Sequence, residues 1–160
     1  MLDPKLVVLD EPVSALDKSV QAQVLNLLDE LKAERALTYV FISHDLSVIE
    51  HVSDRIFVMY LGQVVETGSA DVLAAAPQHP LPARSSPPPS RWDPHARMTE
   101  PPISGDPPNP IHPLSGCRFR TRCAFVMPRC AEAIPPPAAV SDAHHVACCL
   151  FEGEPAPIAA

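Results

Sequence analysis

The distribution of proline constrains this chain more than any other feature of its sequence. Of the 21 prolines in 160 residues, seventeen lie between Pro77 and Pro137. Each proline removes a backbone hydrogen-bond donor, so a segment this rich in proline does not sustain a helix or a sheet ladder. We therefore expect a folded part over residues 1–76 and an extended or disordered linker over residues 77–115.

The segment before Pro77 shows strands alternating with helices. Residues 6–9 are a short, continuously apolar run, which is typical of a strand buried on both faces. Apolar residues recur at helical spacing over 18–35, and a second buried strand is expected at 38–42. This alternation predicts an α/β fold with a parallel sheet.

Capping and turn residues mark the remaining elements of this part. Asp17 is placed to cap the long helix, and Asp45 lies near the start of a short second helix. Leu61-Gly62 separates two apolar segments and indicates a hairpin. Ser69 is expected to cap a last helix over residues 71–76.

The overall composition excludes several classes of protein. The net charge of −7 argues against a nucleic-acid binder, which would normally be basic. No run of about 18 apolar residues is present, so we expect no membrane-spanning segment. The N-terminus resembles no signal peptide, and a cytoplasmic location follows as the default. In a reducing compartment, the five cysteines are expected to be thiols or metal ligands.

Two adjacent acids, Asp10 and Glu11, follow the first predicted strand. In open α/β sheets, ligands bind beyond the carboxyl ends of the strands. An aspartate there suits magnesium, and a neighbouring glutamate can activate a water that attacks a phosphoryl group. Taken alone, the pair is more often the solvated end of a strand than a catalytic site. The second strand ends in Ser43-His44-Asp45, which places His44 at the same sheet edge as Glu11.

Together with Ser14-Ala15-Leu16-Asp17, these motifs resemble the C-terminal part of an ABC transporter ATP-binding subunit over about residues 4–76. The resemblance implies a partial nucleotide-binding domain of the P-loop NTPase type. It implies that Asp10 is the Walker B magnesium residue, Glu11 the catalytic base and His44 the switch histidine. Ser14 and Asp17 correspond to the D-loop, which in the family touches the opposite ATPase subunit.

Three motifs of that family are missing from the sequence. There is no Gly-x-x-x-x-Gly-Lys-Ser/Thr phosphate loop, no Leu-Ser-Gly-Gly-Gln signature and no glutamine loop between them. We therefore expect either a fragment of a longer or split protein, or a decayed gene product. By either account, the isolated chain should be inactive as an ATPase. The competing interpretation is a non-enzymatic remnant or a metal-binding accessory module.

The cysteines near the C-terminus form the second candidate site. Four of them have the spacing C-x5-C-x6-C-x17-C and are Cys117, Cys123, Cys130 and Cys148. This spacing is wider than that of typical zinc sites, and four thiolates can also hold an iron–sulfur cluster. Four independent thiols remain the alternative. We expect the nearby Arg118, Arg120 and Arg122 to form a solvated basic turn, and His144 and His145 to be solvated.

Gln78-His79-Pro80 and residues 116–150 together also resemble a known segment, the C-terminal extension of oligopeptide and dipeptide transporter ATP-binding subunits. The likeness rests on Gln78-His79-Pro80, on Gly116-Cys117-Arg118-Phe119 and on the later cysteines. It implies that Cys117, Cys123, Cys130 and Cys148 bind a [4Fe-4S] cluster, as in some members, with Cys149 in the usual place of a histidine. Residues 151–160 are expected to be a disordered end.

The two resemblances together imply a function, partners and a location. The function is ATP binding and hydrolysis with magnesium, driving peptide import. The expected partners are a second ABC ATPase subunit and membrane permease subunits. The expected location is the cytoplasm, peripheral to the inner face of the cell membrane.

Overall fold

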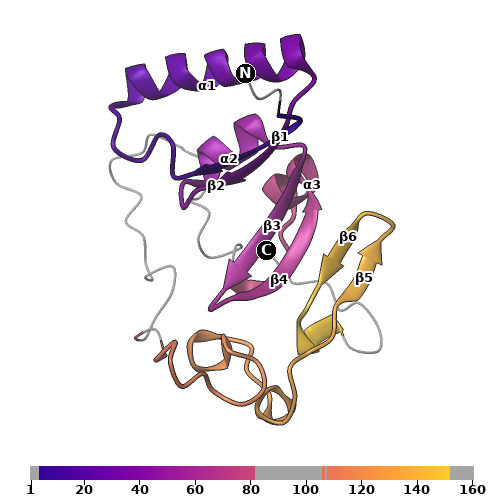
Figure 1. The fold of residues 1–160 in the computed structure, drawn as a ribbon. Coiled ribbons are helices and arrows are strands. Elements are labelled where there is room, and N and C mark those ends of the chain that lie inside the picture. Colours follow the sequence, from indigo (N-terminus) through magenta and orange to yellow (C-terminus); the bar gives the residue numbers. More distant parts are fainter. Residues whose placement is uncertain (1–3, 82–105, 107, 152–160) are drawn as a thin grey trace, which may run out of the picture. The chain divides into compact units, whose positions relative to one another are not determined.

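The structure is a computed structural model, and it describes residues 4–81, 106 and 108–151. It is a mixed α/β structure that divides into two compact units, residues 1–54 and 55–160 (Figure 1). We describe each unit separately. Among the described residues, no helix is long and apolar enough to cross a membrane.

The first unit is a strand–helix–strand crossover followed by a short helix. Its elements in chain order are β1 (Leu6–Asp10), α1 (Lys18–Arg35), β2 (Thr38–Ile42) and α2 (Leu46–Val52). The two strands are parallel, in a register that pairs Leu6 with Thr38 and Asp10 with Ile42. The predicted parallel strands and both helices are therefore present.

Helix α1 begins and ends where its local sequence predicts. The Asp17 side chain accepts hydrogen bonds from the backbone N–H groups of Ser19 and Val20, which satisfies two of the free donors at the helix start. The helix ends at Arg35, and the capping residue Ala36 adopts a left-handed conformation with φ 48°. Leu25 on its inner face packs with Val13 and Val48 to form the core of this unit.

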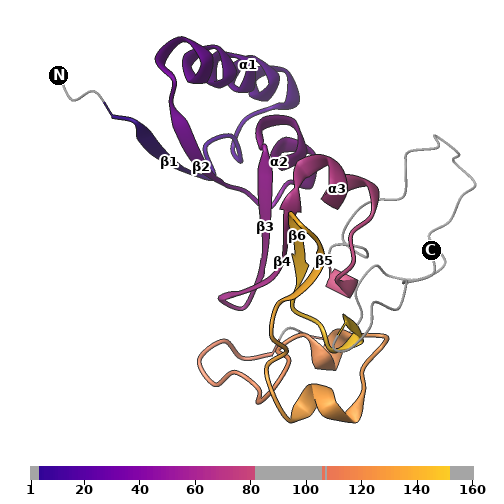
Figure 2. The same cartoon turned by 90° about the vertical axis from the view of Figure 1, so that its right-hand side faces the viewer.

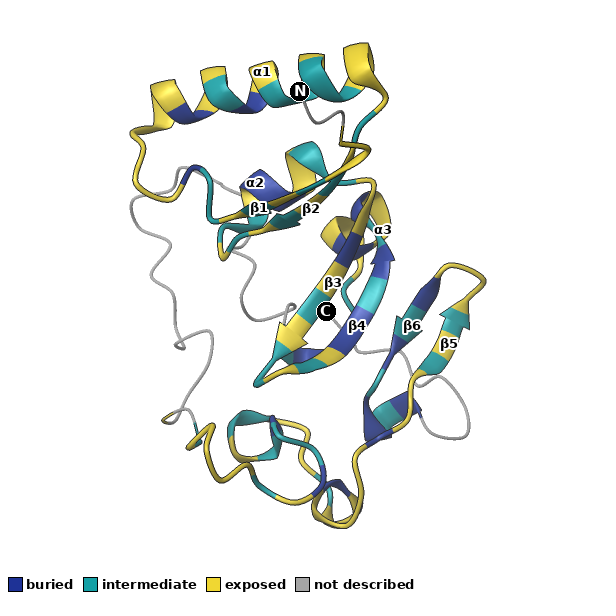
Figure 3. Cartoon of the chain, in the orientation of Figure 1, coloured by how far each residue is buried: buried dark blue, intermediate teal, exposed yellow. Residues whose placement is uncertain are grey.

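The expectation that both strands are buried on both faces is wrong for this sheet. Alternate residues are exposed along β1 and β2, with Leu6, Val8 and Ile42 at 55%, 61% and 47% (Figure 3). The physical reason is that, within the described residues, the sheet has two strands. Helices pack on one of its faces, and the other face keeps an apolar surface exposed.

The second unit is built on a four-stranded antiparallel sheet with the order β3-β4-β6-β5. Its strands are β3 (Arg55–Tyr60), β4 (Gln63–Ser69), β5 (Ala138–Ser141) and β6 (His144–Val146). Its helices are α3 (Ala70–Ala75) and three 3-10 turns, η1 (Arg120–Arg122), η2 (Pro128–Ala131) and η3 (Cys149–Phe151).

Two hairpins far apart in the sequence join to form this sheet. The β3–β4 hairpin turns at Leu61-Gly62, both with positive φ, as the sequence predicts. Strand β4 runs to Ser69, and it pairs with β6 through Glu66–Val146 and Thr67–His145. Figure 2 shows the two hairpins side by side. Ser69 precedes α3, but its side chain forms no capping hydrogen bond.

A buried polar cluster lies where these strands meet. Glu66 and His144 are 1% and 3% exposed, so the expectation that His144 is solvated is wrong. The reason is their pairing: Glu66 Oε1 lies 2.7 Å from His144 Nε2. His79 is equally buried, and its ring lies 5.6 Å from that of Phe119. The neighbouring His145 is half-buried.

Candidate functional site

The first candidate site lies at the carboxyl ends of β1 and β2. Glu11 directly follows β1, has a left-handed backbone (φ 49°), and donates its N–H to the carbonyl of Ile42 at 2.9 Å. His44 follows β2, and its Nδ1 lies 2.8 Å from Glu11 Oε1. The structure thus brings together the two residues that the sequence places at one sheet edge.

The contact between these two side chains also affects the protonation of His44. The hydrogen bond to Glu11, together with the charge of that carboxylate, raises the pKa of His44 above its usual value of 6.5. Both side chains reach solvent, at 76% exposure for His44 and 40% for Glu11. A proton on the imidazole is therefore stabilised by the neighbouring carboxylate in a site open to water.

The other predicted residues of this site lie on the same strand end and loop. Asp10 is the last residue of β1 and is exposed. Ser14 donates its hydroxyl to the Glu11 carbonyl at 3.0 Å, which fixes the turn after the strand. Asp17 caps α1, and hydrogen bonds from Ser19 and from the backbone of Val20 lower its pKa. Ser14 and Asp17 thus hold the shape of the loop.

Asp45, the residue after His44, forms an ion pair within the first unit. Its pKa is lowered to about 2 by the Ser47 hydroxyl and by Lys18, whose Nζ lies 2.9 Å away. This ion pair joins the start of α1 to the start of α2 within the first unit. In the sequence, Asp45 was recognised only as a residue near the start of a helix, and its ion pair with Lys18 was not predicted.

The second candidate site is the cysteine segment of the second unit. Cys130 and Cys148 are buried, and Cys117 and Cys123 are half-buried. The Cys117 N–H donates to the Cys130 carbonyl at 2.8 Å, which brings two of the four predicted ligands to neighbouring backbone positions. Gly116 permits this approach, because its φ is +66° and an added Cβ would lie 2.3 Å from the Cys130 carbonyl oxygen.

Cys148 lies within electrostatic range of the other three predicted ligands. Burial, with smaller contributions from Cys123, Cys117 and Cys130, raises the pKa of the Cys148 thiol to about 11. Burial also raises the pKa of Cys117, with Cys130 contributing. In the described part of the chain, no three His, Cys, Asp or Glu side chains are arranged to hold a metal ion. Binding by all four cysteines therefore stays a prediction.

The arginines beside these cysteines do not form the solvated turn that the sequence suggests. All three are half-buried. Arg118 donates to the backbone carbonyl of Leu61, and Arg122 Nη1 lies 3.5 Å from the Tyr60 hydroxyl. The hairpin β3–β4 covers this turn, which is why it is shielded from water. Within the described residues, Arg120 Nη1 and Arg122 Nε are buried without a hydrogen-bond partner.

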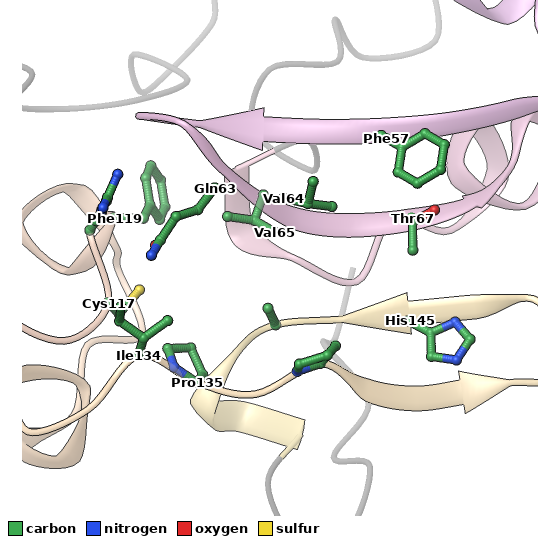
Figure 4. A pocket seen from close by; sticks show the side chains of 13 residues that line it. Phe57, Gln63, Val64, Val65, Thr67, Cys117, Phe119, Ile134, Pro135 and His145 are labelled. Atoms are coloured by element: carbon green, nitrogen blue, oxygen red, sulfur yellow. The ribbon is translucent and has the colours of Figure 1, made fainter. Parts of the chain in front are cut away.

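A cleft of about 590 Å³ lies against the cysteine segment and was not predicted. Figure 4 shows Phe57, Val64 and Val65 of the β3–β4 hairpin on one side, with Ile134 and Pro135 facing them. The sulfur of Cys117 reaches its wall. The cleft is mainly apolar and arises from the pairing of β4 with β6, which no local sequence signal indicates.

Comparison with known proteins shows what this chain is similar to. The family described as "Oligopeptide/dipeptide transporter, C-terminal region" matches residues 65–130. A putative peptide import ATP-binding protein of Brucella ovis is 49% identical over 152 residues, which is 92% of this chain and 46% of that protein. The chain therefore spans about half the length of the curated relatives it matches.

Two further relatives agree with this comparison. The putative oligopeptide transport ATP-binding protein YkfD of Bacillus subtilis is 45% identical, covering 94% of this chain and 46% of that protein. The dipeptide transport ATP-binding protein DppF of Haemophilus influenzae is 46% identical, covering 92% and 45%.

Proposed function

We propose that this chain supplies the sheet edge at which an ABC transporter ATPase hydrolyses ATP. In sequence, the chain corresponds to the C-terminal portion of the ATP-binding subunits of oligopeptide and dipeptide ABC transporters. The observation that carries the proposal is the 2.8 Å contact between Glu11 and His44 at the carboxyl ends of two parallel strands. Nucleotide chemistry in open α/β sheets takes place at this edge.

Each residue of the edge has a proposed role that follows from its chemistry. Glu11, as a carboxylate, accepts a proton from the attacking water. His44 orients that carboxylate through Nδ1 and presents its other nitrogen to solvent-side groups. Asp10, an exposed carboxylate at the strand end, suits magnesium, which neutralises phosphate charge when bound.

Activity would require a further portion that holds the phosphates. The sequence lacks the glycine-rich loop and lysine that cradle phosphate groups. The exposed apolar face of β1 and β2 supports the same idea, because such a face is stabilised only when another element covers it. We infer that ATP hydrolysis drives peptide import once that portion, a second ATPase subunit and membrane permease subunits are in place.

The experiment is a reconstitution of ATPase activity. The isolated chain is compared with the same chain joined to the N-terminal portion of the Bacillus subtilis relative, which is 45% identical over the shared part. We expect magnesium-dependent ATP hydrolysis in the joined protein alone. By calorimetry at millimolar ATP, the isolated chain should show no saturable binding. Saturable, magnesium-dependent binding by the isolated chain would contradict the proposal.

A second candidate function is favoured by the cysteine segment. We propose that Cys117, Cys123, Cys130 and Cys148 hold a [4Fe-4S] cluster, a group that supplies a redox centre or a structural constraint when bound. The support is that all four thiols are buried or half-buried and that a backbone hydrogen bond brings Cys117 next to Cys130. Zinc or no metal are the alternative outcomes.

Anaerobic reconstitution of the full 160-residue chain with iron and sulfide tests this second function. We expect about four iron and four sulfide per chain, with a broad absorbance band in the visible region. Uptake of zinc alone would favour a metal-binding accessory module of another kind. No metal uptake would leave the four thiols as independent groups.

A further inference from the structure

Two side-chain contacts join the loop that follows β1 to the loop that follows β2. At the start of the first loop, Glu11 Oε1 lies 2.8 Å from His44 Nδ1. At its end stands Lys18, the first residue of α1, whose Nζ lies 2.9 Å from Asp45 Oδ2. His44 and Asp45 are neighbours in the sequence. The ion pair therefore holds the residue next to one member of the Glu11–His44 contact.

The carboxylate of Asp45 has a different partner on each oxygen. Oδ1 accepts the backbone N–H of Ser47 at 3.0 Å and caps α2, whereas Oδ2 accepts from Lys18. The backbone N–H of Asp45 donates to the Ser43 hydroxyl at 3.1 Å. Because the cap and the Ser43 contact involve residues of the same turn, it is the lysine that ties this turn to α1.

The ion pair is too exposed to contribute much to the stability of the whole unit. The Lys18 side chain is 80% exposed and that of Asp45 is 33% exposed. Water screens such pairs, so they add little to the free energy of unfolding. The core residues Val13, Leu25 and Val48 already pack the first loop, α1 and α2 together. The ion pair is therefore suited to placing one turn rather than to driving folding.

The orientation of His44 depends on the placement of its backbone. Its side chain is 76% exposed, so packing does not fix it, and its hydrogen bond to Glu11 sets its direction. A displacement of the turn by about 1 Å would stretch this contact beyond hydrogen-bond distance.

We propose that Lys18 is a positioning residue for the sheet edge at which ATP is hydrolysed, and that it acts through Asp45 to hold His44 within hydrogen-bond distance of Glu11. The inference rests on the proposed function, in which Glu11 accepts the proton of the attacking water and His44 orients its carboxylate. Lys18 itself contacts neither the substrate nor the reacting atoms.

Steady-state ATP turnover of the joined protein is the first test. For Lys18→Met, we expect kcat to fall about fivefold, which is about 1 kcal/mol at 1.4 kcal/mol for each factor of ten, with the KM for ATP unchanged. Lys18→Arg should restore most of kcat, because it keeps the charge. Lys32→Met is the matched control. It removes a 2.8 Å ion pair with Asp54 at the other end of the same helix and should leave kcat unchanged.

Asp45→Asn separates the ion pair from the helix cap. Asparagine is also a good N-cap residue, so α2 keeps its first turn while the charge is lost. This variant should lower kcat to a similar extent as Lys18→Met, and the double variant should lower it no further. Losses that multiply in the double variant would overturn the proposal, because the two residues would then act separately.

The protonation of His44 in the 160-residue chain gives a readout that a purely structural role would not change. The main cause of its raised pKa is the hydrogen bond to Glu11, and the charge of Asp45 adds to it. If Lys18 maintains the contact with Glu11, Lys18→Met should lower the pKa of His44 in an NMR titration. If Lys18 acts only by its charge, the pKa should rise, since the charge of Asp45 is then unbalanced. A raised or unchanged pKa overturns the proposal.

The outcomes separate this inference from the function on which it rests. A joined protein without ATPase activity rejects the proposed function, and with it the role of Lys18 in turnover. An active joined protein in which Lys18→Met and Lys32→Met hydrolyse ATP equally fast rejects the role of Lys18 alone. A lowered kcat of Lys18→Met together with a lowered pKa of His44 supports both.

Discussion

Glu66 Oε1 lies 2.7 Å from His144 Nε2, joining β4 to β6 across 78 residues of sequence. The same carboxylate accepts the backbone N–H of Gln78 at 2.7 Å and that of His79 at 3.0 Å. One buried side chain thus holds together the hairpin, the start of the proline-rich stretch and the end of the cysteine segment. A carboxylate suits this place because it only accepts hydrogen bonds.

Replacing Glu66 with glutamine should destabilise the second unit. Each carboxylate oxygen accepts from at least one donor, so the amide NH2 of Glu66→Gln must face a donor in either orientation. A buried donor left without an acceptor costs about 1–3 kcal/mol. Denaturant unfolding should show a loss of about that size. Glu132→Gln, at an exposed position, is the control, and equal stability of the two variants would rule out this account.

The stability of the chain should fall in mild acid because of His79. Burial lowers the pKa of His79 from 6.5 to about 4. The unfolded chain therefore binds this proton first, and stability decreases as the pH falls from about 6.5 to 4. The full difference is about 3 kcal/mol at 1.36 kcal/mol for each pKa unit.

The measurement is the free energy of unfolding between pH 7.5 and 4. His79→Asn keeps an acceptor for the N–H of Leu81, which His79 Nδ1 now accepts at 3.1 Å. In this variant, the part of the pH dependence of the free energy of unfolding that comes from His79 should be absent. His112→Gln, at an exposed position, should keep it. The same pH profile in His79→Asn and the parent chain would show that His79 is not the responsible group.

Gly116 should tolerate no side chain. An alanine there would combine a left-handed φ of +66° with a Cβ 2.3 Å from the Cys130 carbonyl oxygen, so the backbone must move. We expect Gly116→Ala to cost about 2–4 kcal/mol and to disturb the cysteine segment. Gly62→Ala is the comparison, since Gly62 also has a positive φ but its nearest contact, an arginine side-chain atom, lies at 3.7 Å. Thermal unfolding of both should show Gly116→Ala as the less stable; the reverse order would contradict this.

The adjacent cysteines at the C-terminal end should differ in function. Cys148→Ala should abolish cluster formation, whereas Cys149→Ala should retain iron, because one cluster of this kind takes four thiolates. Cys148 is also the thiol that interacts with the other three predicted ligands. Iron content after anaerobic reconstitution distinguishes them. Iron retained by Cys148→Ala and lost by Cys149→Ala would identify Cys149 as the fourth ligand.

Local signals predicted the secondary structure of the first unit well. The helix over 18–35 and the strand over 38–42 have the predicted bounds, because a cap, an apolar period and a turn lie within a few residues of each end. The meeting of Glu11 and His44 followed from the same elements, since parallel strands end at one sheet edge.

Local sequence signals did not predict the contacts between residues far apart in the sequence. Glu66 looks like any acid of an amphipathic strand, and only its partner 78 residues away makes it a buried acceptor. The pairing of β4 with β6 likewise depends on tertiary contact, as do the cleft and the shielding of Arg120. The exposed face of β1 was missed because a continuous apolar run indicates burial on both sides, while only one face is packed here.

The most direct test of the proposed function is the ATP turnover of Glu11→Gln in the protein joined to a phosphate-binding portion. The amide keeps the shape of the side chain but cannot accept the proton of the attacking water. We predict a loss of turnover of at least about 100-fold with nucleotide binding retained, and no change for Glu50→Gln, an exposed acid of α2. Turnover of Glu11→Gln near that of the parent protein would contradict the assignment of this sheet edge as the hydrolytic site.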